Sequence, residues 1–115
     1  MRHISFSHTT EQMRAKTKTV TRRLRWATLK AGETLMAAEK IMGLPKGAKI
    51  ATIGPIEIIS VRTEPLETVL QEGPAGMARE GFPGMSPAEY VAFFCKANRC
   101  PPSAIIRRIE FRPLY

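Results

Sequence analysis

KIATIGPIEIISVR, residues 49–62, gives the strongest indication of β structure in this chain. Its five isoleucines and one valine are β-branched, and side chains of this kind are enriched in strands. The Gly54-Pro55 step lies in the middle, where proline removes a backbone donor from the ladder. The segment therefore predicts either one bent strand or two strands.

Three shorter segments are expected to be further strands: residues 3–7, 34–38 and 105–111. The first alternates apolar and polar side chains, while the second also allows a helix. In the third, Ile105, Ile109 and Phe111 share one face of the strand. These segments surround residues 49–62 in the sequence and predict a small sheet.

The clearest helix begins at residues 86–89, Ser-Pro-Ala-Glu. This tetrapeptide supplies a capping hydroxyl, a proline in the first helical position and a reciprocal carboxylate at the third. Four apolar residues follow at helical spacing: Tyr90, Phe93, Phe94 and Ala97. We expect Tyr90, Phe93 and Phe94 to pack in the core.

Two other segments have weaker helical character. Thr9, with Gln12 three residues later, predicts a short helix that ends in the basic segment after it, and residues 65–70 predict a helical turn. Residues 73–76, Gly-Pro-Ala-Gly, are expected to be flexible. Together the segments predict an α+β protein, a small barrel or sheet with one long helix.

The chain of 115 residues, 43% of them hydrophobic, predicts one soluble domain over residues 1–115. No apolar run approaches the roughly 20 residues that cross a bilayer, so we expect a cytoplasmic protein without membrane contact.

Cys95 and Cys100 are expected to remain thiols, and with His3 and His8 they do not have zinc-ligand spacing. We expect no metal, and no cofactor because a phosphate-cradling glycine loop is absent.

Residues 12–32 are strongly basic. They hold no acid and seven cations: Arg14, Lys16, Lys18, Arg22, Arg23, Arg25 and Lys30. The whole chain has a net charge of +8. Such charge attracts a polyanion, whether RNA, DNA or anionic lipid. It is also typical of a solvated surface.

Four residues of this segment are candidates for nucleic-acid contact: Lys16, Arg22, Arg23 and Trp26. Guanidinium groups match phosphate oxygens, and an indole ring can stack on a base. The alternatives are structural: one of the two neighbouring arginines pairs with Glu33 or Glu80, and Trp26 closes the core.

The segment Lys18-Thr19-Val20-Thr21-Arg22-Arg23 also carries a resemblance, together with the Ala31-Gly32-Glu33 turn, the Glu80-Gly81-Phe82 step and a final Ile-x-Phe strand. Over nearly its whole length the chain resembles the ASCH domains of the PUA-like superfamily. The resemblance implies a β-barrel of about five or six strands with flanking helices, and a cleft that holds a nucleobase or nucleotide.

Some small ASCH proteins with a Lys-Thr-x-Thr-x-Arg segment are amidohydrolases that act on N4-acylated cytidine. Their active sites contain a lysine, a threonine three positions later and a glutamate ahead of the long helix. The matching residues here are Lys18, Thr21 and Glu80, although two to three extra residues separate Glu80 from the helix.

The chemistry of these residues allows two interpretations. In a helical turn Lys18 and Thr21 would share one face, and neighbouring cations would help Lys18 to lose its proton and activate the Thr21 hydroxyl. Glu80 would then orient the pair or carry a proton to the leaving amine. Alternatively, Lys18 only pairs with a phosphate and Thr21 bonds to the backbone.

Three functions are therefore open. The first is binding of RNA or of a modified nucleobase, nucleoside or nucleotide in a basic cleft. The alternative is an amidohydrolase that acts on an N4-acylated cytidine-type nucleoside. A third possibility is a regulator that binds a protein partner through an acidic surface. Whether the protein is an enzyme stays open, and a partner other than RNA or a nucleoside is unknown.

Overall fold

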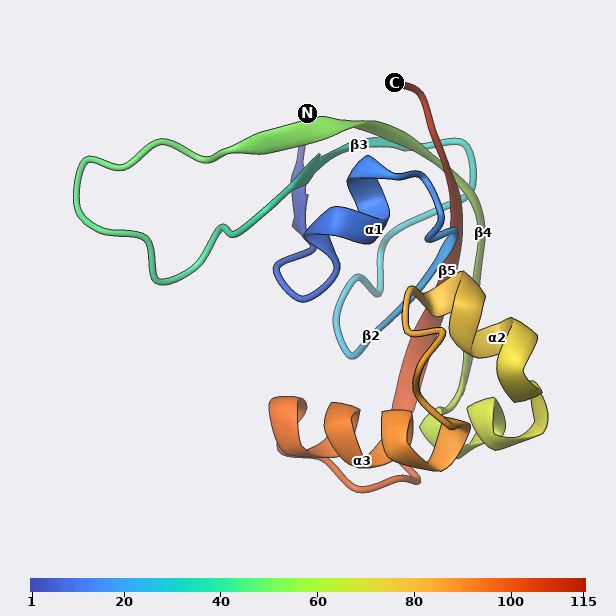
Figure 1. Ribbon diagram of the computed structural model, residues 1–115. Coiled ribbons are helices and arrows are strands. Elements are labelled where there is room, and N and C mark those ends of the chain that lie inside the picture. The colour runs from blue at the N-terminus through green and yellow to red at the C-terminus, as the bar shows by residue number, and fades with distance from the viewer.

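The computed structural model describes all residues, 1–115. The elements in chain order are β1 (His3–Ser5), α1 (Thr10–Arg14), β2 (Val20–Arg23), β3 (Thr34–Ala38), β4 (Thr52–Pro65), the 3₁₀ helix η1 (Leu66–Gln71), α2 (Gly73–Glu80), α3 (Pro87–Asn98) and β5 (Ile105–Pro113) (Figure 1). This α+β composition agrees with the sequence-based prediction, and the strands expected at residues 34–38 and 105–111 are both present.

The five strands form one mixed sheet with the order β1-β3-β4-β5-β2. β1 is parallel to β3, and the other neighbours are antiparallel. β1 and β2 are the two edges and do not pair with each other, so the expected closed barrel is wrong. The sheet is curved but open, because side chains and not backbone hydrogen bonds span the space between the edge strands.

β4 is one continuous strand of 14 residues, and it is not divided at Gly54-Pro55. Figure 1 shows it curving over α1 and down the sheet. Its register against β5 shifts between Ile58 and Ser60, which marks a bulge. Gly54 allows a close contact, because a Cβ atom there would lie 2.3 Å from the ring of Tyr115. The glycine thus lets the end of the chain pack flat on β4.

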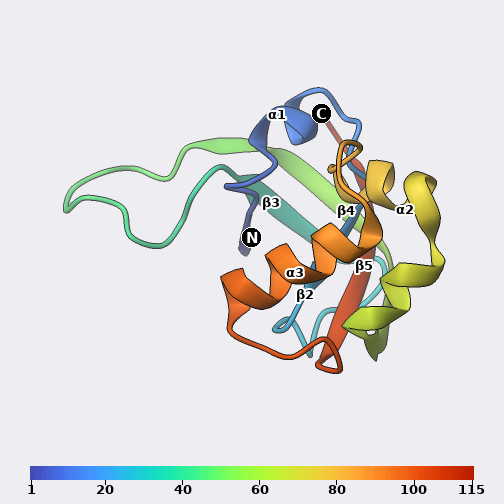
Figure 2. The same cartoon turned by 60° about the horizontal axis from the view of Figure 1, so that its bottom comes forward.

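Two apolar clusters form the core. The first lies against the curved sheet and contains Ile4, Phe6, Met13, Leu29, Leu35, Ala37, Ile56, Ile58, Ile109 and Phe111. The second lies beneath the helices and contains Leu66, Val69, Met77, Tyr90, Val91, Phe94 and Ile106. Figure 2 shows α2 and α3 on the same side of the sheet. Ile105, which was expected to share one face of the strand with Ile109, is 53% exposed, whereas Ile109 is buried.

α3 begins as the sequence predicts. The Glu89 amide donates to Ser86 Oγ at 3.1 Å, and the Ser86 amide donates to Glu89 Oε1 at 2.9 Å, which completes a capping box. α1 is present too, although the Thr9 side chain makes no capping bond.

The expectation of a flexible segment at residues 73–76 is wrong, because they form the first turn of α2. Gly76 and Met77 are buried there, so tertiary packing stabilises a helix that glycine disfavours by itself. α2 ends at Glu80, and Gly81 follows with a φ of +95°. This left-handed residue turns the chain away from the helix and leaves Glu80 at the helix end.

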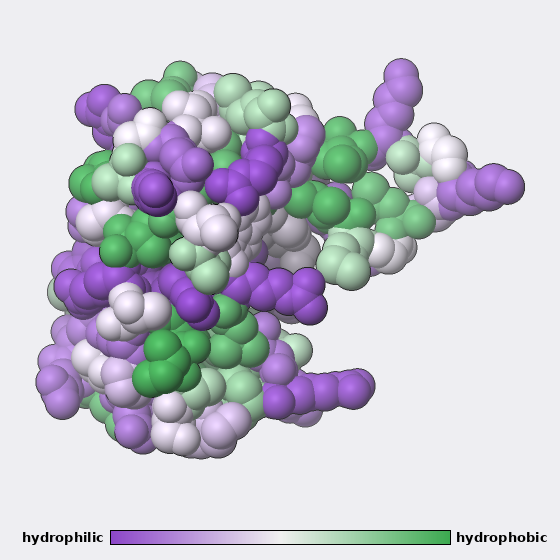
Figure 3. Space-filling model, turned by 180° about the vertical axis from the view of Figure 1, so that it is seen from behind, coloured by the Kyte–Doolittle hydropathy of each residue, from purple (hydrophilic) through white to green (hydrophobic).

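A long loop, residues 39–51, projects from the body between β3 and β4. Its base is held by a 2.9 Å hydrogen bond from the Glu39 amide to the Ala51 carbonyl. Seen from behind, it extends to one side with both apolar and hydrophilic residues along it (Figure 3). Met42 within it is 80% exposed. No helix in the structure has the length and apolar character that a bilayer crossing requires.

Candidate functional site

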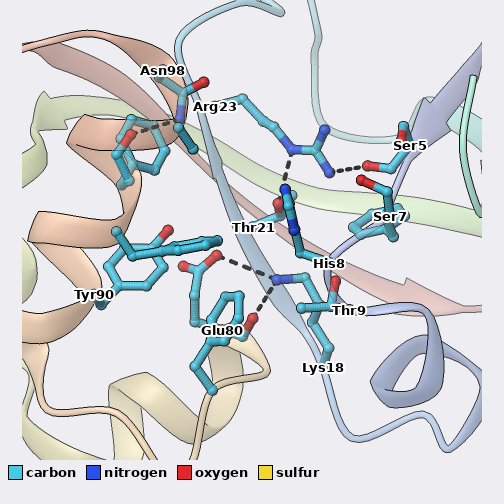
Figure 4. Close-up of a pocket in the computed structure, with 15 residues that line it drawn as sticks. Ser5, Ser7, His8, Thr9, Lys18, Thr21, Arg23, Glu80, Tyr90 and Asn98 are labelled. Carbon is cyan, nitrogen blue, oxygen red and sulfur yellow. Dashed lines mark hydrogen bonds and ion pairs between the residues drawn. The ribbon is translucent and has the colours of Figure 1, made fainter. Parts of the chain in front are cut away.

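A cavity of about 230 Å³, here called the main cavity, lies where the two apolar clusters meet. Its aromatic wall consists of Phe6, Phe82, Tyr90, Phe93 and Phe94. The polar lining consists of Ser5, Ser7, His8, Thr9, Lys18, Thr21, Arg23, Glu80 and Asn98 (Figure 4). The three residues that match the ASCH amidohydrolase site therefore line one partly open cavity.

The basic segment reaches the cavity through β2 and through Lys18, which lies two positions before this strand. Residues 20–23 form a strand and not the helical turn that was expected around Lys18 and Thr21. β-Branched side chains at Thr19, Val20 and Thr21 favour this conformation. Thr21 and Arg23 both line the cavity, because side chains two apart share one face of a strand.

Glu80 comes from the end of α2 and is the centre of a buried ion-pair network. Its side chain is 2% exposed. Lys18 Nζ donates to Glu80 Oε2 at 3.3 Å and also to the Glu80 carbonyl oxygen. The Arg22 amide donates to Oε2 at 3.2 Å, and Arg22 Nη1 donates to Oε1 at 2.7 Å. One carboxylate thus pairs with two buried cations and accepts a hydrogen bond from a backbone amide of the edge strand β2.

The charge of Lys18 is weakened by its surroundings. Burial is the main cause and lowers the pKa of Lys18 from 10.5 to about 8, and repulsion from Arg23 and Arg22 adds to it. The attraction of Glu80 opposes the shift without cancelling it. A measurable fraction of Lys18 is therefore neutral near pH 8 and able to accept a proton.

Arg23 holds the Thr21 hydroxyl and spans the two edges of the open sheet. Its Nε donates to Thr21 Oγ1 at 3.0 Å, and its Nη2 donates to the Ser5 carbonyl of β1 at 2.5 Å. Nη1 has no hydrogen-bond partner in the protein, and the guanidinium lies 4.9 Å from the Phe6 ring centroid. No hydrogen bond joins Lys18 to Thr21, so the threonine hydroxyl keeps its own proton available to a ligand or base.

The aromatic wall offers ring faces and edges to a flat ligand. Phe82 and Phe93 have centroids 5.4 Å apart, and His8 meets Phe93 edge-on at 5.3 Å. Burial, and then the negative charge of Glu80, raise the pKa of Tyr90 well above its usual range, so its hydroxyl stays protonated. Sequence reasoning placed Tyr90 and Phe93 in the core only. The helical spacing that marked them as apolar gives no sign that they also border a cavity.

Several polar lining residues were missed altogether: Ser5, Ser7, His8, Thr9 and Asn98. The first four lie at the end of β1 and just after it. Functional side chains are often found where a strand ends in a loop, which was the one available signal.

Arg22 does not face the cavity in the way expected of a phosphate ligand. Its side chain is 1% exposed and pairs with Glu80 and Glu72, with Glu64 at 4.0 Å. Burial lowers the pKa of Arg22, but attraction to Glu80 and Glu72 outweighs it and raises the pKa. The structural alternative, an arginine paired with Glu80, is confirmed. A nucleic-acid contact by Arg22 would require this network to open, so we leave Arg22 out of the site.

Lys16 and Trp26 also lie outside the main cavity. Lys16 is exposed, and its ammonium lies 5.3 Å from the Tyr115 ring centroid. Trp26 is half-buried against the first apolar cluster, and the guanidinium of Arg2 lies 5.1 Å from its ring. The structure therefore brings Lys18, Thr21, Arg23 and Glu80 together and separates them from the other two. It contains no group of three or more His, Cys, Asp or Glu side chains that could hold a metal ion.

The sequence matches no family model and no curated protein. Three solved structures are similar to this one. They are the hypothetical protein PH0355 (17% identity, TM-score 0.66, 99% of this chain and 100% of that chain), protein EF3133 from Enterococcus faecalis V583 of family DUF984 (14%, 0.61, 94% and 71%) and an ASCH domain from Lactobacillus crispatus JV V101 (14%, 0.58, 99% and 80%). At these identities the likeness concerns the fold. This chain therefore has the fold of an ASCH domain, as the short motifs around Lys18 and Glu80 predicted.

Proposed function

We propose that the main cavity binds the base of a modified nucleoside or nucleotide. The observation that carries the proposal is that aromatic side chains and the buried Lys18–Glu80 pair line the same cavity. The volume of about 230 Å³ is roughly eight times the ~30 Å³ share of one water molecule. That space suits a single small ring with its substituents and excludes a stretch of several nucleotides.

The polar groups in the cavity complement the edge of a pyrimidine base. A carboxylate such as Glu80 accepts from an exocyclic N–H, as it does from cytosine N4. Protonated Lys18 has three N–H donors, and its two bonds to Glu80 leave one for a ring nitrogen or carbonyl oxygen. Phe82 and Phe93 supply ring contacts, which contribute about 1–3 kcal/mol per base. The resemblance to ASCH proteins that act on N4-acylated cytidine supports N4-acetylcytidine as the first ligand to test.

A pocket-filling variant tests binding without disturbing the ion-pair network. Ala97 and Ala92 are both exposed residues of α3, but only Ala97 lines the main cavity. Ala97→Phe is expected to weaken N4-acetylcytidine binding at least about tenfold in isothermal titration calorimetry, and Ala92→Phe to leave it unchanged. If the wild-type protein binds no N4-acetylcytidine, or if Ala97→Phe binds it as well as the wild type does, the cavity is not the base site.

Hydrolysis of an acyl amide is a second candidate, favoured by the lowered pKa of Lys18, about 8. In this reaction Thr21 Oγ1 attacks the acyl carbon while its proton passes to neutral Lys18 Nζ. The carbon–nitrogen bond breaks, and the proton is delivered to the departing amine, with Glu80 positioned to carry it. Water then cleaves the acyl-threonine ester, which yields a carboxylic acid and restores the hydroxyl. Release of cytidine and acetate from N4-acetylcytidine balances these steps.

Thr21 separates the second candidate from the first. Thr21→Ser keeps a nucleophilic hydroxyl and is expected to retain turnover, whereas Thr21→Ala is expected to bind the ligand and release no cytidine on chromatography. Turnover should rise with pH through about 8, because the base is neutral Lys18. Undiminished turnover by Thr21→Ala would remove the acyl-enzyme route, and binding without any turnover in the wild type would leave the binding function alone.

A further inference from the structure

A second concave site lies next to the main cavity and is here called the second hollow. It has a volume of about 430 Å³ and is lined by Arg2, His3, Ser5, Arg23, Arg25, Trp26, Ala27, Thr28, Ile41 and Met42. Three of these side chains are guanidinium groups, one is an indole ring, and none is an acid. The composition suits an anion next to a flat or apolar group.

The two sites share Ser5 and Arg23. These residues lie at the two edges of the open sheet, and the hydrogen bond from Arg23 Nη2 to the Ser5 carbonyl joins them. The two sites therefore adjoin at Arg23, which borders both of them. At that junction Arg23 Nη1 has no protein partner, although the other two guanidinium nitrogens are hydrogen-bonded.

The charges in the second hollow are available to a ligand. Burial lowers the pKa of Arg23 to about 10, so Arg23 stays protonated at neutral pH. Arg25 is exposed and forms no ion pair. Arg2 pairs with Glu33 at 3.4 Å, but both side chains are largely exposed, and such a pair is weak and readily exchanged. The loop residues Ile41 and Met42 also line the second hollow.

We propose that the second hollow is a phosphate subsite for the ligand whose base occupies the main cavity, with Arg23 Nη1 and Arg25 as phosphate donors. This inference rests on the proposed base site and narrows its ligand to a nucleotide, either free or within an RNA strand. A free nucleoside would leave the guanidinium groups without their anion. Trp26, which lines the second hollow and not the main cavity, then serves the phosphate side by holding Arg2 against its ring.

Binding measurements with three probes test the subsite. N4-acetylcytidine, its 5′-monophosphate and its 3′-monophosphate are titrated into the wild-type protein, Arg25→Gln and the control Lys96→Gln. Lys96 is exposed on α3 and lines neither site, so the control removes the same charge elsewhere. We expect one monophosphate to bind at least about tenfold more tightly than the nucleoside, since charge-assisted bonds to phosphate are strong. Arg25→Gln should weaken that monophosphate about fivefold and the nucleoside not at all.

The outcomes separate this inference from the proposed function. If the nucleoside binds as tightly as both monophosphates, or if Arg25→Gln weakens all probes equally, the subsite is refuted and the base site stands. If no probe binds, both fail. A short oligoribonucleotide containing N4-acetylcytidine distinguishes the two sources of phosphate. Tighter and more salt-dependent binding than the monophosphate identifies an RNA strand, and equal or weaker binding identifies a free nucleotide.

Discussion

Lys18 makes the stability of the protein depend on pH in an unusual direction. Its pKa is about 8 in the folded protein and 10.5 in the unfolded reference. Between these values the unfolded chain binds a proton at Lys18 that the folded chain has released, so the free energy of unfolding rises with pH. The contribution over pH 7 to 9 is about 1.3 kcal/mol, and over the whole window it is about 3 kcal/mol. Below pH 8 the buried charge destabilises the fold by that larger amount.

Urea unfolding at pH 7 and pH 9 measures this contribution, using the wild type, Lys18→Met and the exposed control Lys16→Met. Other titrating groups cancel in the comparison. We expect the wild type and Lys16→Met to gain about 1.3 kcal/mol more between the two pH values than Lys18→Met does. An equal gain in all three proteins would show that Lys18 keeps an ordinary pKa, which would also remove its proposed role as a base at neutral pH. Lys18→Gln provides a second test if the methionine variant does not fold.

Three further predictions concern stability and are measured by urea unfolding. Glu80→Gln leaves Lys18 buried without its counter-charge, while Arg22 keeps Glu72, and should destabilise the protein by about 3–5 kcal/mol, whereas Glu57→Gln, which breaks an exposed pair with Arg112, should change stability by less than about 1 kcal/mol. Gly54→Ala should destabilise by about 1–3 kcal/mol through contact with the Tyr115 ring; a similar loss in a Tyr115→Ala background would contradict that cause. Ser86→Ala removes the helix cap and should lower stability by about 1 kcal/mol, and no change would mean that the α3 capping box is dispensable.

The elements that were predicted correctly are those marked by neighbouring residues in the sequence, such as a helix cap or a run of β-branched side chains. The Ser86 cap and the spacing of the aromatic residues fixed α3, and the isoleucine-rich stretch fixed most of β4. The prediction of a flexible segment at residues 73–76 was wrong because two glycines within four residues indicate flexibility. Only burial of Gly76 and Met77 makes a helix there favourable. A single sequence does not show that these residues are buried by tertiary packing.

For the candidate site, the sequence indicated which residues come together but not their geometry. Lys18, Thr21 and Glu80 do meet in one cavity, but through a strand and not a helical turn. Treating residues 20–23 as a strand would have placed the side chains of Arg22 and Arg23 on opposite faces, so that only one of them could serve the cavity. The partnership of Arg22 with three glutamates from distant segments has no signature in the sequence, because it depends on how α2 and β4 pack beside β2.

The open sheet also affects how molecules of this protein meet one another. Exposed strand edges can recruit strands from other chains and so start aggregation, and a barrel avoids the danger by having no edges. Here each edge is short, three residues in β1 and four in β2. On β2 the outward amide of Arg22 is already occupied by Glu80. The same carboxylate that organises the interior of the site therefore also helps to keep neighbouring copies from adding a strand, and its loss should favour self-association as well as unfolding.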